Sequence, residues 1–153
     1  MDNKGFTLIE LIFVILILGV ILAFSLPNIS STLQKNKKDQ MIVDAKDMVE
    51  KTKTYMLTYS AYPTASDSDK KREFFLKDID PREEIKTSPY GLEYDRDVSK
   101  VTVTYVKNSG LVTYKYEIVL QDKNTTEQTK NNKLESTLED LNSSDKYDII
   151  TVN

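Results

Sequence analysis

Apolar and polar residues are distributed very unevenly along the 153 residues of the chain. Near the start, an almost unbroken apolar run, FTLIELIFVILILGVILAFSL, extends from Phe6 to Leu26, and Glu10 is its only ionisable side chain. As an α-helix at about 1.5 Å per residue, this run would be roughly 30 Å long, which is the thickness of a bilayer core. The pattern predicts a transmembrane helix over residues 6–26.

A second pattern, with helical spacing, follows the apolar run. Between about residues 27 and 62, apolar and small side chains recur three and four residues apart, which predicts an amphipathic helix. The apolar stripe consists of Met41, Ala45, Met48, Thr52, Tyr55, Met56 and Tyr59, and the opposite face carries Lys35, Lys38, Asp39, Lys46, Asp47, Glu50, Lys51 and Lys53. We expect a sheet to bury the stripe, since such a helix needs a second layer, and we expect the charged face to be solvated.

The remaining segment, 63–153, is predicted to be a β-rich globular head. Two runs of alternating residues, Lys100–Lys107 and Leu111–Gln121, flank Asn108-Ser109-Gly110 and predict a β-hairpin. One face of this hairpin should cover the helical stripe; its residues are Val101, Val103, Tyr105, Val112, Tyr114, Tyr116, Ile118 and Leu120. Further strands over 92–94 and 147–152 would give three or four antiparallel strands, because a lone hairpin is marginally stable.

Two segments of the head are predicted to form short helices. The first covers residues 70–79 and would bury Phe74, Phe75 and Leu76. The second lies within the stretch between Gln121 and Ser144, where a polar loop precedes Leu134, Leu138 and Leu141 at helical spacing. The predicted fold class is therefore α+β, with a long N-terminal helix packed on a three- or four-stranded antiparallel sheet.

Composition narrows the chemistry that the chain can perform. The formal net charge is −3, and there is neither cysteine nor histidine. Disulfides and thiol or imidazole metal sites are thereby excluded, and the commonest general base at neutral pH is missing. No nucleophile–base combination is recognisable, so we expect no enzyme activity and no cofactor. The acidic balance also gives no reason to expect specific binding of nucleic acid.

Glu10 requires an explanation, because a carboxylate within an apolar membrane helix costs about 2.5 kcal/mol or more unless it is compensated. Cleavage of the chain just before Phe6 would create an α-amino group one helical turn from Glu10, on the same chain or on a neighbour. Read separately, the residues have simpler explanations: a linker at Gly5, a snorkelling acid at Glu10 and a helix terminator at Pro27. A signal anchor would fit those explanations, whereas an ordinary signal peptide fits poorly with so long an apolar run.

The string Lys4-Gly5-Phe6-Thr7-Leu8-Ile9-Glu10 resembles the processing motif of type IV prepilins and type II secretion pseudopilins. The resemblance covers about the first 30 residues and implies a leader, 1–5, that a prepilin peptidase cuts between Gly5 and Phe6. It further implies an N-methylated Phe6, a Glu10 carboxylate that registers each subunit in a filament, and a kink or local opening of the helix at Pro27. The implied fold is that of a type IV pilin.

The same resemblance implies partners and a location. The partners would be the prepilin peptidase, other pilin subunits, the inner-membrane assembly machinery and, before assembly, membrane lipid. The protein would span the membrane once and then join an extracellular surface filament, a fimbrium of the kind used in adhesion or twitching motility. A minor pilin is the first hypothesis for its function, and a pseudopilin of a type II secretion or DNA-uptake machine is the alternative.

Two other readings of the head stay open at the level of sequence. A signal-anchored surface domain could bind a ligand such as DNA or a glycan through Lys107, Tyr114, Lys115 and Tyr116. Acids at Asp67 and Asp69, or at Glu139, Asp140 and Asp145, could hold Ca²⁺, as some pseudopilins do. Their spacing does not resemble an EF-hand, so solvated loop charge is the favoured interpretation and no metal is predicted.

Overall fold

A computed structural model describes residues 7–67, 70–123, 132–143, 146 and 149–151, with the backbone alone at 25–28. Helix α1 (Leu8–Tyr59) is the first described element and accounts for both predicted helical segments. The chain divides into two compact units, residues 1–36 and residues 37–153. The first unit therefore contains the apolar part of α1 and the start of its amphipathic part, and the second contains the rest of the amphipathic part together with the head.

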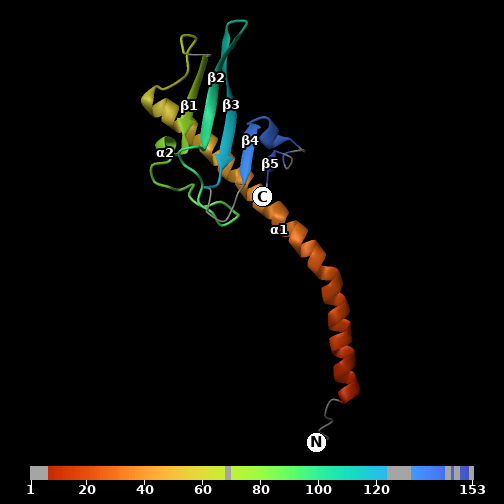
Figure 1. Ribbon diagram of the computed structural model, residues 1–153. Helices are drawn as coiled ribbons and strands as arrows, with labels where there is room; N and C mark the ends of the chain where they lie inside the picture. Colours follow the sequence, from red (N-terminus) through yellow and green to blue (C-terminus); the bar gives the residue numbers. More distant parts are fainter. Residues whose placement is uncertain (1–6, 68–69, 124–131, 144–145, 147–148, 152–153) are drawn as a thin grey trace, which may run out of the picture. The chain divides into compact units, whose positions relative to one another are not determined.

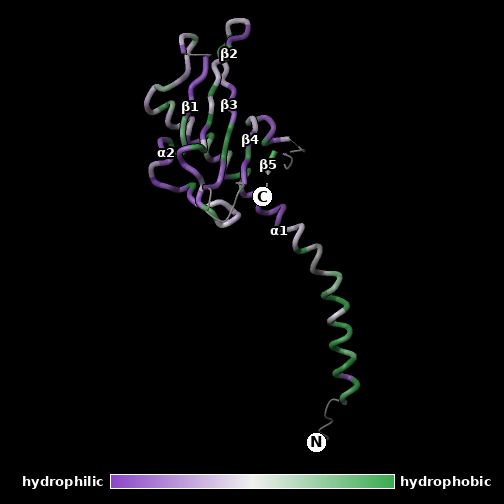
Figure 2. Tube along the Cα trace, in the orientation of Figure 1, coloured by the Kyte–Doolittle hydropathy of each residue, from purple (hydrophilic) through white to green (hydrophobic). Residues whose placement is uncertain are grey.

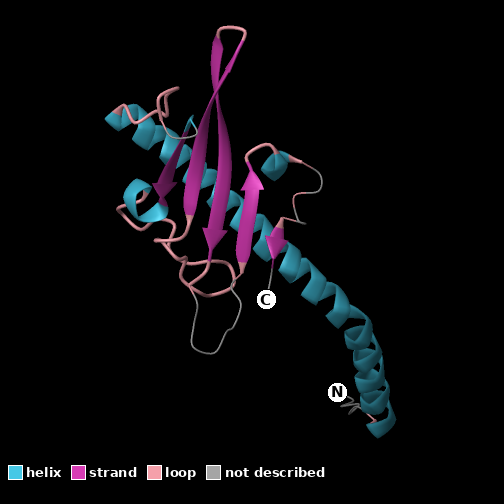
Figure 3. Cartoon of the chain, turned by 45° about the horizontal axis from the view of Figure 1, so that its top comes forward, coloured by secondary structure: helices cyan, strands magenta, loops and turns pink. Residues whose placement is uncertain are grey.

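The second unit contains a sheet of five antiparallel strands in the order β1-β2-β3-β4-β5, so every strand pairs with its neighbour in sequence (Figure 1). The strands are β1 (Lys71–Phe75), β2 (Lys100–Asn108), β3 (Leu111–Gln121), β4 (Lys133–Thr137) and β5 (Ile150–Thr151). Helix α2 (Leu76–Ile79) follows β1, and the 3-10 helix η2 (Asp140–Asn142) follows β4. The amphipathic part of α1 crosses one face of this sheet (Figure 3).

The core lies between that helix and the sheet. The buried hydrophobic residues are Met41, Ile42, Ala45, Met48, Val49, Met56, Phe74, Leu76, Ile79, Ile85, Tyr94, Val101, Val103, Ile118, Leu120, Leu134, Leu141 and Ile150. Most of the predicted stripe of α1 is thus buried, whereas Tyr55 is partly buried and Tyr59 is 67% exposed because it lies in the last turn of the helix. The predicted fold class, a long helix packed on an antiparallel sheet, is confirmed.

The predicted hairpin is also confirmed, with β2 and β3 in register from Lys100↔Val119 to Asn108↔Leu111. Pairing places Val101 opposite Ile118 and Val103 opposite Tyr116, so the expected face is the one that meets α1. The two residues between the strands, Ser109 and Gly110, both have positive φ, as a type I′ turn requires.

Several predictions for the head are wrong. Residues 71–75 form strand β1 rather than part of a helix over 70–79, because they pair with β2, and only 76–79 are helical. The segment around Leu134 forms β4, and only η2 near Leu141 is helical. Residues 92–94 make isolated bridges, Thr87↔Glu93 and Tyr94↔Asp122, and no strand of their own. The described sheet has five strands because β1, β4 and β5 add to the hairpin, and β5 lies within the strand predicted over 147–152.

Candidate assembly site

The first described turn of α1 is closed by a reciprocal hydrogen-bond pair between Thr7 and Glu10. The backbone N–H and the hydroxyl of Thr7 each donate to Glu10 Oε2 at 2.8 Å, and the Glu10 N–H donates to Thr7 Oγ1 at 3.4 Å. This is a capping box, in which a Thr N-cap and an acid three residues later satisfy the free donors at a helix N-terminus. The carboxylate of Glu10 therefore has partners within its own chain.

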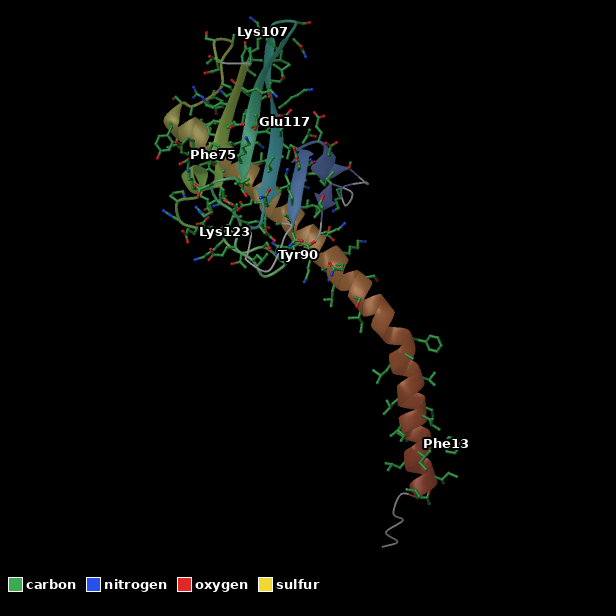
Figure 4. The ribbon with its side chains drawn as sticks, viewed as in Figure 1. Phe13, Phe75, Tyr90, Lys107, Glu117 and Lys123 are labelled. Atoms are coloured by element: carbon green, nitrogen blue, oxygen red, sulfur yellow. The ribbon has the colours of Figure 1, made fainter. Side chains whose placement is uncertain are left out.

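The apolar part of α1 exposes its side chains on all sides. Large hydrophobic side chains that are more than 40% exposed occur at Leu8, Ile9, Leu11, Ile12, Phe13, Val14, Ile15, Leu16, Ile17, Leu18, Val20, Ile21, Leu22 and Phe24. Figure 2 shows this stretch as one hydrophobic block, and Figure 4 shows the ring of Phe13 pointing away from the helix. By length and composition α1 could cross a membrane. Such a surface needs lipid or other apolar helices around it.

The other residues of the predicted processing motif can be placed only in part. Gly5 and Phe6 lie outside the described residues, as does the leader before them. The backbone at Pro27 lies inside α1, and the kink there stays a prediction. Thr7 was not predicted as a functional residue, although T-x-x-E is the sequence signature of the capping box and could have identified it.

In the head, a buried tyrosine connects the α1 helix to the loop before β2. Tyr94 is completely buried, and its hydroxyl donates to Asp44 Oδ2 at 2.8 Å. Gln40 donates to the other carboxylate oxygen of Asp44 at 2.8 Å. Burial raises the pKa of the Asp44 carboxyl, and burial beside that carboxyl also raises the pKa of Tyr94. The hydroxyl of Tyr94 therefore stays protonated and serves as a donor.

A second connection is ionic and centres on Asp80, which is 1% exposed. Its carboxylate accepts hydrogen bonds from the N–H groups of Glu84 at 3.2 Å and Ile85 at 2.9 Å. Lys51 of α1 and Arg96 approach it from two sides, each at 3.3 Å. Burial by itself would raise the pKa of Asp80, but the two backbone donors and Lys51 hold it below the usual value. No pattern in the sequence indicated this cluster.

Several of the residues considered for ligand or metal binding make contacts within the head, whereas Lys107, Lys115 and Glu139 are exposed. The Tyr114 ring lies 5.5 Å from the Tyr62 ring, and Lys53 lies 5.5 Å above the Tyr116 ring. Asp67 accepts hydrogen bonds from Thr64, and Asp140 accepts them from Thr137, so these acids close local turns. Asp69 and Asp145 lie outside the described residues. Within the described part of the chain, no three acids gather as metal ligands.

Comparison with known proteins agrees with this geometry. Residues 1–26 match the family described as the prokaryotic N-terminal methylation motif. Over 62 residues the chain is 36% identical to the type II secretion system core protein G of Dickeya chrysanthemi. That match covers 40% of this chain and 40% of the relative, so the chain spans well under half of the length of that relative. No solved structure matches the chain significantly.

The methylation-motif match thus covers the start of a long helix that by length and composition could cross a membrane, and an antiparallel sheet follows this helix in the chain. Both comparisons support the resemblance of residues 4–10 to the pilin and pseudopilin family. Proteins of this family are structural rather than enzymatic.

Proposed function

We propose that the chain is a structural subunit of a type IV pilus, most consistent with a minor pilin. In this proposal the leader, 1–5, is removed between Gly5 and Phe6 by a prepilin peptidase, Phe6 is N-methylated, and residues 6–26 polymerise as a transmembrane helix that leaves the membrane. The observation that carries the proposal is the apolar part of α1, which is exposed throughout and contains one ionisable residue, Glu10.

The energetics favour assembly through this helix. Once it leaves the lipid, its apolar surface gains roughly 25 cal/mol for every Å² that other subunits cover. The Glu10 carboxylate then needs compensation at low dielectric, and the Phe6 α-amino group of a neighbour would supply it. In the unassembled chain Thr7 partly fills that need, because it donates two hydrogen bonds to the carboxylate. An ion pair between Glu10 and the α-amino group of a neighbour would replace the hydrogen bonds from Thr7. This replacement would favour the filament in which the subunits are in register.

In the proposed arrangement residues 27–62 continue the helix into the head, 63–153, which faces outward from the filament. The protein crosses the inner membrane once before assembly, in contact with lipid and the pilus assembly machinery, and afterwards lies on the extracellular surface. Adhesion and twitching motility are the filament activities to examine, since both depend on surface pili.

The test is mass spectrometry of the mature N-terminus combined with two variants. We expect a chain that starts at a methylated Phe6. Gly5→Ala should leave the precursor uncut, and Glu10→Val should be cut normally but be absent from filaments. Glu10→Asp is the matched control, because it keeps the charge, and it should retain part of the incorporation. An intact leader on the mature protein, or normal filaments from Glu10→Val, would reject the proposal.

A pseudopilin of a type II secretion machine is the second candidate, and the similarity to the core protein G of Dickeya chrysanthemi favours it. A pseudopilin of a DNA-uptake machine shares the same N-terminal requirements. Deletion of the gene separates these candidates: loss of surface pili indicates a pilin, loss of secreted enzymes indicates a secretion pseudopilin, and loss of transformation indicates the DNA-uptake machine.

A further inference from the structure

The β2–β3 hairpin extends beyond the rest of the sheet. Strand β1 pairs with β2 only as far as Thr104, and β4 pairs with β3 only from Glu117 onward. Residues 105–116 therefore form a two-stranded segment, here called the ribbon, whose outer backbone groups have no strand beside them among the described residues. Figure 3 shows the ribbon projecting past its neighbours, and Figure 4 places Lys107 near its tip.

The ribbon presents an apolar tip flanked by positive charge. Leu111 is 68% exposed and Val112 is 41% exposed, although both lie in a strand. Lys107 and Lys115 are exposed beside them, and no acid occurs within 105–116. An exposed apolar strand end with unpaired backbone is normally protected in a native protein, so a partner surface is expected here.

The head also contains a groove whose rim carries acidic side chains, in contrast to the basic ribbon. It has a volume of about 460 Å³ and lies between one face of α1 and the segment from α2 to Glu84. Its lining residues are Asp47, Glu50, Lys51, Thr54, Tyr55, Thr58, Tyr59, Asp78, Ile79, Asp80, Pro81, Arg82 and Glu84. Of the five carboxylates among them, Glu50, Asp80 and Glu84 form described ion pairs, so Asp47 and Asp78 supply the acidic rim. The rings of Tyr55 and Tyr59 lie 4.6 Å apart and provide an apolar wall.

The tip of the ribbon is held away from the α2 side of the groove in its own chain. Pairing of Phe75 with Lys100 places α2 at the start of β2, whereas the ribbon lies at the end of that strand. At about 3.4 Å per residue, the length of β2 separates the tip of the ribbon from α2 by well over 20 Å. The base of the ribbon lies closer to the end of α1, because the rings of Tyr62 and Tyr114 are 5.5 Å apart. Because the hairpin is continuously paired, it does not fold back. The two complementary surfaces of one head are therefore available to different molecules.

We propose that the tip of the ribbon of one subunit docks in the acidic, tyrosine-walled groove of a second copy of this chain. Leu111 and Val112 would contact Tyr55 and Tyr59, while Lys107 and Lys115 would meet the acidic rim. The contact joins two different surfaces, so it is heterologous and repeats along an open filament instead of closing into a symmetric dimer. The partner of the head is thus a second copy of this chain. This contact rests on the proposed function, in which the N-terminal helices bring the copies together.

Cysteine cross-linking tests this contact directly, because the chain contains no cysteine of its own. Leu111→Cys is placed in one tagged full-length chain and Thr58→Cys in another, and both are produced in the same cells. Oxidation should give a mixed, disulfide-linked dimer. As the matched control, Val98→Cys replaces Thr58→Cys, since Val98 is also exposed but lies outside the groove. We expect at least tenfold less dimer with this control.

Charge reversal supplies the second measurement. Lys107→Glu with Lys115→Glu places like charges together and should reduce the mixed dimer roughly tenfold. Adding Asp47→Lys and Asp78→Lys to the partner chain should restore it, because the signs are complementary again. Restoration also shows that the reversed heads still fold.

Two results would overturn the proposal. One is a mixed dimer no more abundant than the Val98→Cys control in filaments that assemble normally, and the other is a dimer formed by Leu111→Cys alone, which indicates ribbon-to-ribbon pairing. Both leave the proposed function intact. Failure of the proposed function is recognised separately, by an uncut leader or by the absence of any filament containing the unmodified chain.

Discussion

The hydroxyl of Tyr94 donates a 2.8 Å hydrogen bond to the carboxylate of Asp44, and this pair fastens the α1 helix to the segment that leads into β2. Fifty residues separate the two in sequence, so the bond is a tertiary connection rather than a local one. Together with the Lys51–Asp80–Arg96 cluster, it fixes the helix against the sheet by polar contacts at the border of an apolar core.

Tyr94→Phe should lower the free energy of unfolding by about 1 to 2 kcal/mol. The ring remains and keeps its packing, but Asp44 loses a donor and keeps only Gln40, so the effect is that of an unsatisfied, partly buried acceptor. Chemical denaturation of the full-length chain in detergent, followed by circular dichroism, measures the change. Tyr105→Phe is the control, because no hydrogen bond to its hydroxyl is described, and a loss as large as that of Tyr94→Phe would contradict this explanation.

The raised pKa of Asp44 predicts a pH-dependent stability. Between its ordinary pKa of about 3.9 and the raised native value, the folded state binds a proton that the unfolded state has released. The Asp44 carboxyl therefore stabilises the folded state increasingly as the pH falls through this window. Once ionised, it destabilises the folded state. Asp44→Asn removes the titration.

The difference in unfolding free energy between Asp44→Asn and the unmodified chain should thus change between about pH 7 and pH 4, with the variant relatively more stable at the higher pH. Asp80 acts in the opposite sense, because its lowered pKa gives stability that is lost in acid. Asp80 is present in both Asp44→Asn and the unmodified chain, so its effect cancels in the difference between them. A constant difference across the range would show that Asp44 does not titrate as proposed.

Asp80→Ala should be the most damaging of these substitutions, with a loss of about 3 kcal/mol. It leaves Lys51 and Arg96 facing each other without the buried carboxylate, and it removes the acceptor for two backbone N–H groups. The matched control is Glu84→Gln, since Glu84 also contacts Lys51 but is exposed, and it should cost less than about 1 kcal/mol. Equal losses from both variants, measured by denaturation, would contradict the central role of Asp80.

The capping box predicts a local effect at the start of α1. Thr7→Val keeps the shape of the side chain but removes the hydroxyl, so the first turn should lose about 1 kcal/mol of local stability. Amide hydrogen exchange in detergent micelles should become faster for residues 8–11 only. Thr7→Ser should exchange like the unmodified chain, and faster exchange throughout α1 would indicate a general disruption instead.

The helix and the hairpin could be predicted from sequence because their periodicities extend over many residues. By contrast, Leu134, Leu138 and Leu141 have helical spacing, yet they lie in β4, in the turn after it and in η2. All three face the same core through different backbone conformations, so their spacing carries no information about secondary structure. Similarly, β1 is a strand because it pairs with β2, a contact that no local pattern of five residues reveals.

The candidate functional residues also divide into those that the sequence reveals and those that it does not. The apolar run and Glu10 were evident from composition and position, since a single acid among aliphatic residues stands out. The partner of Glu10 in the unassembled chain, Thr7, had a local signature that could have been read. The environment of Asp80 had none, because Lys51 and Arg96 reach it from separate segments of the chain.

Two substitutions in the turn of the ribbon should change the stability of the hairpin in opposite directions. Gly110 has φ of +88°, and an added Cβ would meet no atom within 4 Å, so Gly110→Ala acts through backbone conformation alone. It should destabilise the hairpin by about 1 kcal/mol, because alanine disfavours positive φ. Ser109 already has φ of +50° without being glycine, and Ser109→Gly should relieve that cost and stabilise the hairpin by up to about 1 kcal/mol.

Because residues 105–116 pair only with each other among the described strands, both effects should be confined to the ribbon. Hydrogen exchange of the amides near Asn108 and Leu111 should accelerate in Gly110→Ala and slow in Ser109→Gly, while the amides of Val101 and Ile118 stay unchanged. Accelerated exchange at Val101 in Gly110→Ala would show that the turn supports the whole sheet, and unchanged exchange at the tip would show that the strain at these positive φ angles is absorbed elsewhere.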